Sequence, residues 1–163
     1  MSEDTNKLTI LNRSFYFVRH GQTDWNKNQN TLCPAPDIQL NAIGIRQVEN
    51  VRPQINELNI SKIYSSPLTR AQETAEIINE QLQVPLELHE GLGKIKSESV
   101  AQAFNTILKS NDGPLLIVSH GEVYRVLLQI LDAQAAHSNA QNAGLYHFEV
   151  DSTGNWTIHP MKS

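Results

Sequence analysis

Two histidines, His20 and His120, each stand where an apolar run ends and a glycine follows. The first closes the stretch "FYFVRHG" and the second closes "LLIVSHG". A short continuous apolar run is typical of a strand that is buried on both faces. In a parallel sheet, ligands gather at the edge formed by the carboxyl ends of the strands. One histidine at such a place is more often structural, but two in equivalent places predict a shared site.

Two arginines add positive charge to this predicted site. Arg19 directly precedes His20, and Arg70 lies in "SSPLTRAQETA", where the pattern puts it in the first turn of a helix. Helix N-termini favour negative charge, so an arginine there is unusual unless an anion lies beside it. The four side chains therefore predict a site for an anion.

The rest of the chain alternates between predicted strands and predicted helices. Apolar runs predict buried strands at 15–18, 61–66, 84–88 and 114–119. Helical spacing of apolar residues predicts helices over 41–58, interrupted or kinked at Pro53, from a cap at Ser66 to 82, and over 97–110 and 121–133. Alternation around the turn residues 151–155 predicts a C-terminal hairpin or a pair of edge strands. This order predicts an α/β fold, a three-layer α/β/α sandwich with a mostly parallel central sheet.

Length and composition predict one globular domain over residues 1–163, with residues 1–13 as a flexible or peripheral segment. The net charge of −4 argues against a nucleic-acid partner. The apolar stretches are shorter than the roughly 20 residues of a membrane helix. The polar N-terminal segment lacks the layout of a signal peptide, and Cys33 is the only cysteine. These features predict a cytoplasmic protein without a membrane partner.

The motifs "VRHGQTDWN", "YSSPLTRAQETA" and "VSHGEVYRVLL" together resemble the histidine phosphatase superfamily, the phosphoglycerate mutase-like proteins. The resemblance runs from residue 14 to about 150. It implies that His20 is a nucleophile that forms a phosphohistidine, without a metal or another cofactor. It also implies that the phosphoryl oxygens are bound by a protonated His120 and by further residues: Arg19, Thr23, Asn26, Arg70 and Gly121.

His20 must be neutral to attack phosphorus, and neighbouring cations should lower the pKa of its imidazole. A hydrogen bond from its other ring nitrogen to a backbone carbonyl is expected to fix the tautomer.

The proton donor for the leaving oxygen is expected in "LELHEGLGKIKSES". Glu90 in "LHEG" is favoured over Glu87 because it matches the family's leucine-any-glutamate element better. The alternative that both glutamates are solvated surface residues stays open. The reason is that Lys96-Ser97-Glu98 replaces the tryptophan-glutamate-glycine continuation of the family.

Only residues 91–114 separate Glu90 from the strand that begins at Leu115. So short a connection predicts an open, shallow site. The sequence thus favours a phosphatase that acts on a small phosphorylated substrate or on a phosphorylated protein side chain. Two alternatives stay open: a phosphoglycerate mutase-type phosphomutase, and a phosphate-binding module that has lost turnover.

Overall fold

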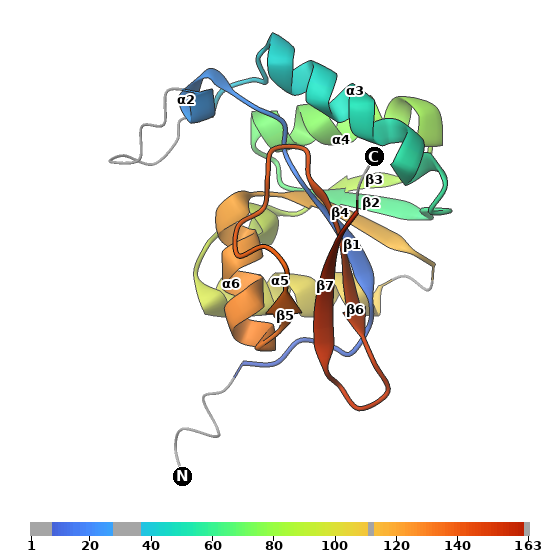
Figure 1. Cartoon of the computed structure of the whole chain (residues 1–163), viewed down its shortest axis with the longest axis vertical. Helices are drawn as coiled ribbons and strands as arrows, with labels where there is room; N and C mark the ends of the chain where they lie inside the picture. The colour runs from blue at the N-terminus through green and yellow to red at the C-terminus, as the bar shows by residue number, and fades with distance from the viewer. Residues whose placement is uncertain (1–7, 28–36, 111–112, 162–163) are drawn as a thin grey trace.

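The structure of the chain, a computed structural model, describes residues 8–27, 37–110 and 113–161 (Figure 1). Its strands are β1 (Phe15–Arg19), β2 (Lys62–Ser65), β3 (Leu86–Leu88), β4 (Leu115–Ser119), β5 (Gln134–Ala135), β6 (Leu145–Val150) and β7 (Trp156–Met161). Its helices are α2 (Asp24–Lys27), α3 (Ala42–Asn56), α4 (Thr69–Leu82), α5 (Ser97–Lys109) and α6 (Gly121–Leu131), together with a 3₁₀ turn, η1 (Glu90–Gly93).

The seven strands form one sheet in the order β3-β2-β4-β1-β6-β7-β5. Strands β3, β2, β4 and β1 are parallel to one another, whereas β6 runs antiparallel to both β1 and β7. Figure 1 shows α3 and α4 together on one side of the sheet and α5 and α6 on the other. The predicted sandwich with a mostly parallel sheet is confirmed, and so is the C-terminal hairpin. The two-residue strand β5 was not predicted.

The central strand β4 is buried at all five positions. Its Leu115 and Ile117 belong to the apolar cluster under α5 and α6, while Leu116 and Val118 belong to the cluster under α3 and α4. Successive side chains of a strand point to opposite faces, so a continuous apolar run is needed when helices cover both faces. This double burial explains why the run is apolar up to its carboxyl end.

Helix α4 begins later than the sequence indicates. The sequence predicts a cap at Ser66, but the helix starts at Thr69. The Ser66 hydroxyl instead accepts a hydrogen bond from the Leu68 amide at 3.2 Å. The Thr69 amide donates to Oδ1 of Asp37 at 2.7 Å, so a residue from far upstream takes the capping role.

The other helix boundaries agree more closely with the prediction. The side chain of Asn41 caps α3 by accepting from the Gly44 amide at 2.8 Å. Helix α3 continues through Pro53 and ends at Asn56. Ser97 is the first residue of α5. Among the described residues, no helix combines the length and the apolar composition that crossing a lipid bilayer requires.

Candidate active site

The sheet brings His20 and His120 to the same edge. Strands β1 and β4 are parallel neighbours with Arg19 opposite Ser119, so each histidine directly follows the carboxyl end of its strand. The His20 amide donates to the Ser119 carbonyl at 3.1 Å. The two ring centroids are 5.2 Å apart, with an interplanar angle of 62°. Both residues are buried, at 3% and 7% exposure, so the two imidazoles share a secluded position at the predicted edge.

The tautomer of His20 follows from one hydrogen bond. Its Nδ1 atom lies 2.7 Å from the carbonyl oxygen of Gly21. A carbonyl oxygen only accepts, so Nδ1 carries the hydrogen and Nε2 of the neutral ring keeps its lone pair. Burial above all, and then the nearby His120, Arg19 and Arg70, hold the pKa of His20 well below its usual 6.5. The ring is therefore neutral at physiological pH.

Without a bound anion, His120 is neutral as well. The protonated His120 that the resemblance implies stays a prediction for the phosphate-bound state. Burial, followed by the charges of Arg70 and Arg19, lowers the pKa of His120 to about 3. Its Nε2 atom lies 2.8 Å from Oγ of Ser66, and its buried Nδ1 has no hydrogen-bond partner among the described residues. A bound anion would favour the protonated ring, because opposite charge nearby raises the pKa of a histidine.

Arg19 ends β1, and its guanidinium packs against the start of α6. Its Nη1 donates to the Ala140 carbonyl at 2.7 Å. A Cβ atom at Gly121 would lie 3.2 Å from Nε and 3.3 Å from Cζ of Arg19. Glycine at position 121 thus leaves room for the guanidinium beside the first turn of the helix. Burial is the main reason why the pKa of Arg19 is lowered, yet a guanidinium stays charged at neutral pH.

Arg70 enters from the second position of α4 and is 8% exposed. Burial lowers its pKa, and the carboxylates of Asp37 and Glu122 oppose that effect. Glu122 has the same opposing effect on Arg19, so it lies near both guanidiniums. With both imidazoles neutral, the two guanidiniums supply two positive charges. That charge matches a phosphate dianion.

Three further residues were expected to bind phosphate. Thr23 is 1% exposed and follows His20 by three residues, close to the edge where the histidines meet. Asn26 falls within α2, but its side chain lies outside the described part of the structure. Gly121 is the first residue of α6, immediately after His120, so its amide belongs to the helix N-terminus that faces this edge.

Gly21 fixes the segment after His20 against α3. A Cβ atom at Gly21 would lie 2.6 Å from the backbone oxygen of Gly44. The Gly21 amide donates to Oγ1 of Thr74 at 3.1 Å, and this hydroxyl donates to the Arg70 carbonyl at 2.8 Å. The glycine thus allows a close backbone contact that ties the His20 loop to two helices.

Three hydroxyl residues that support the site, Ser66, Thr74 and Ser119, were not identified as such from the sequence. Each is fully buried. The hydroxyl of Ser119 donates to the Leu92 carbonyl at 2.6 Å and thereby fastens η1 to the end of β4. Their only signal in the sequence is their place inside or near the motifs.

The structure separates the two candidate proton donors. Strand β3 is parallel to β2, and the His89 amide donates to the Ser65 carbonyl at 2.9 Å, so Glu90 follows at the same sheet edge as the histidines. Glu90 is exposed and opens η1. Glu87 instead forms an ion pair of 2.9 Å with Lys62, the first residue of β2, away from the carboxyl end of that strand.

Comparison with known proteins identifies the family of the chain. The model of the histidine phosphatase superfamily (branch 1) matches residues 15–99. An uncharacterized phosphatase, PhoE, of Bacillus subtilis is 47% identical over 69 residues, which are 42% of this chain and 35% of that protein. An agropine synthesis reductase of Rhizobium rhizogenes is 30% identical over 186 aligned positions, which cover 93% of this chain and 42% of that protein. The chain thus spans less than half the length of these two relatives.

Solved structures share the fold at low sequence identity. A mycobacterial glucosyl-3-phosphoglycerate phosphatase, in a complex with VO3, superposes with a TM-score of 0.74 at 16% identity, covering 93% of this chain and 98% of that one. A phosphoserine phosphatase from Entamoeba histolytica, in complex with 3-phosphoglyceric acid, gives a TM-score of 0.66 at 22% identity, covering 92% and 97%.

Proposed function

The chain belongs to the histidine phosphatase superfamily, and we propose that it is a phosphomonoester hydrolase whose nucleophile is Nε2 of His20. The hydrogen bond from Nδ1 of His20 to the Gly21 carbonyl carries this proposal, because it leaves the lone pair of Nε2 available. The lowered pKa of His20 keeps that lone pair unprotonated at neutral pH.

In the first step, Nε2 of His20 attacks phosphorus and the bond from phosphorus to the leaving oxygen breaks. The carboxylic acid of Glu90 gives its proton to that oxygen, and the phosphoryl group stays on His20. In the second step, a water molecule attacks phosphorus while Glu90 takes up its proton. The bond between phosphorus and nitrogen then breaks and releases phosphate.

The phosphoryl oxygens are held by the two guanidiniums and by His120. Arg19 is half-buried and Arg70 is buried, and they come from different elements, which suits binding to different oxygens of one group. The unpartnered Nδ1 of His120 can serve the same anion once the ring is protonated. Thr23, Asn26 and the amide of Gly121 complete the proposed phosphate site. Preorganised donors of this kind are commonly worth about 3 kcal/mol each in the transition state.

The proposed substrate is a small phosphomonoester, and the proposed open site also accommodates a phosphorylated protein side chain. Between Glu90 and Leu115, the described chain forms η1 and α5, and α5 packs on a face of the sheet rather than over its edge. This supports an open site. The phosphatases among the similar structures act on phosphorylated small molecules according to their names, which supports the same substrate class.

The test is release of phosphate from p-nitrophenyl phosphate in the presence of EDTA. Wild-type protein should turn over with the chelator present, and His20→Ala should lose about 10³-fold or more in kcat. His159→Ala, on the exposed C-terminal hairpin, is the matched control and should keep the wild-type rate. Wild-type activity in His20→Ala would refute the proposal. Conversion of 3-phosphoglycerate to its 2-isomer, with a trace of bisphosphoglycerate, would favour the phosphomutase instead.

A further inference from the structure

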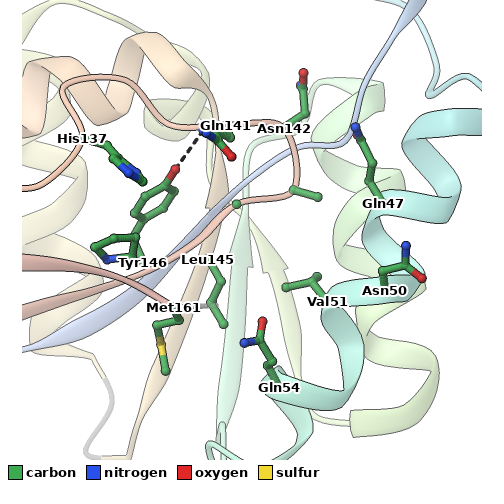
Figure 2. Close-up of a pocket in the computed structure, with 13 residues that line it drawn as sticks. Gln47, Asn50, Val51, Gln54, His137, Gln141, Asn142, Leu145, Tyr146 and Met161 are labelled. Atoms are coloured by element: carbon green, nitrogen blue, oxygen red, sulfur yellow. Dashed lines mark hydrogen bonds between the residues drawn. The ribbon is translucent and has the colours of Figure 1, made fainter. Parts of the chain in front are cut away.

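A separate pocket lies at the edge of the sheet, where β6 begins and β7 ends, beside α3 (Figure 2). Its volume is about 620 Å³. That size falls within the roughly 300–1,000 Å³ that small-molecule sites usually have. Neither the two histidines nor the two arginines of the proposed phosphate site line this pocket, so the pocket is distinct from that site.

The lining of this edge pocket is largely polar, with His137 and Tyr146 among its residues. Five carboxamide side chains take part, three from α3 and two from the segment before β6: Gln47, Asn50, Gln54, Gln141 and Asn142. Val51, Leu145 and Met161 add an apolar surface between them, as Figure 2 shows. No Lys, Arg, Asp or Glu is among the lining residues. A carboxamide both donates and accepts hydrogen bonds, which matches the hydroxyl groups of a sugar.

Gln54 provides a polar atom that lacks a partner. Its Oε1 atom is buried and has no hydrogen-bond partner among the described residues. Buried polar atoms are nearly always paired, and this shielded oxygen gains a partner when the Gln54 side chain, which lines the pocket, turns toward a ligand donor. Figure 2 shows the Gln54 carboxamide on the side of α3 that faces Leu145.

One wall of the edge pocket is shared with the catalytic backbone. The Ala143 amide donates to the carbonyls of Arg19 and His20, at 2.9 and 3.1 Å. The side-chain amide of Asn142 donates to the His20 carbonyl at 3.2 Å. Ala143 holds this position with a φ of 56°, a left-handed conformation that an alanine rarely adopts. On the α3 side, Oε1 of Gln47 accepts from the Gln22 amide at 2.9 Å.

We propose that the edge pocket binds an uncharged carbohydrate and that its occupancy changes the affinity of the neighbouring phosphate site. The sugar hydroxyls pair with the carboxamides, and the C–H face of the ring lies on Val51, Leu145 and Met161. Because Asn142 and Ala143 contact both the pocket and the His20 carbonyl, a ligand that fixes them also acts on the catalytic loop. Such coupling is reciprocal by thermodynamic necessity.

Binding is tested by calorimetry on the whole protein with N-acetylglucosamine, maltose and myo-inositol. At least one of these probes should bind saturably, whereas arginine and glutamate should not. The affinity should fall at least tenfold in Gln54→Leu and in Asn50→Leu, and stay unchanged in Gln129→Leu, which lies on α6 away from the pocket. Failure of all three probes, or wild-type affinity in a folded Gln54→Leu or Asn50→Leu, would overturn the proposal.

The coupling is tested by vanadate affinity with and without the bound probe. A change of at least about fivefold is expected, and an unchanged value would refute the coupling. His20→Ala should bind the probe as the wild type does, and loss of binding there would show that the pocket is not a separate site. The proposed coupling rests on the proposed function, but the proposed carbohydrate binding does not. Probe binding without any vanadate binding would therefore count against the phosphatase and not against the carbohydrate site.

Discussion

Nε2 of His120 lies 2.8 Å from Oγ of Ser66, and both residues are buried. The same hydroxyl accepts a hydrogen bond from the Leu68 amide, and the Ser66 amide donates to the Val118 carbonyl. One serine thus connects the end of β2, the entry to α4 and the second histidine of the site. Because a ring nitrogen of His120 is committed to Ser66, the opposite nitrogen is the one left for a ligand.

Removal of this hydroxyl should lower activity more than stability. In Ser66→Ala, His120 loses its orienting partner, which is worth about 1 kcal/mol, so kcat/KM should fall about fivefold to tenfold. The control is Ser61→Ala, whose hydroxyl donates to the Pro114 carbonyl near the amino ends of β2 and β4. Steady-state kinetics on phenyl phosphate measures the effect. Equal activity of the Ser66 and Ser61 variants would show that the hydroxyl does not position His120.

The two buried histidines should make the protein less stable in mild acid. Both have a lower pKa in the folded state than the roughly 6.5 of an unfolded chain. Below pH 6.5 the unfolded chain binds more protons than the folded chain does, so the free energy of unfolding decreases as the pH is lowered. For His120 this decrease continues down to about pH 3. Each histidine adds a slope of at most about 1.4 kcal/mol per pH unit.

Urea unfolding at pH 7, 6 and 5 measures this slope. His120→Gln should reduce it. A free energy of unfolding that increases as the pH is lowered from 7 to 5 would contradict the assignment of neutral, buried imidazoles.

The glycines that follow the two histidines should respond differently to alanine. In Gly21→Ala, the new methyl meets the backbone oxygen of Gly44, which cannot move easily, so the free energy of unfolding should fall by about 1–3 kcal/mol. In Gly121→Ala, the methyl meets the side chain of Arg19, which can shift. That variant should keep most of its stability and lose at least about tenfold in kcat/KM. Thermal unfolding and kinetics on both variants separate the effects, and the reverse ranking of stability would refute this explanation.

Glu90 should matter most for substrates with a poor leaving group. The p-nitrophenolate anion leaves without protonation, whereas the oxygen of an alkyl phosphate needs a proton. Glu90→Gln should therefore lower kcat/KM, which reports the first step, about 10²-fold for ethyl phosphate and much less for p-nitrophenyl phosphate. Glu87→Gln, which removes the partner of Lys62, is the matched control and should leave both rates unchanged. An equal loss on both substrates in Glu90→Gln would exclude it as the acid.

The main features of the fold and the convergence of the site could be predicted because they depend on local pattern. The apolar runs before His20 and His120 identify strands buried on both faces, and the order of elements makes those strands parallel. Arg70 could be placed because helical spacing puts it in the first turn of α4. These signals need no knowledge of distant contacts.

The remaining details depend on contacts between residues that are far apart in the chain. The start of α4 shifts because Asp37 caps it from 32 positions upstream. The neutral state of His120 follows from burial, which the sequence around it does not reveal. The roles of Ser66 and Ser119 likewise arise from hydrogen bonds to residues 54 and 27 positions away.

The pairing of β1 with β4 also determines when the site can exist during synthesis. Tyr16 pairs with Leu116, so the first strand leaves the ribosome long before its central neighbour is translated. Contacts of such long sequence separation slow folding, and unpaired strand edges promote aggregation in the meantime. The nascent chain consequently holds His20 on an incomplete sheet until β4 has been translated.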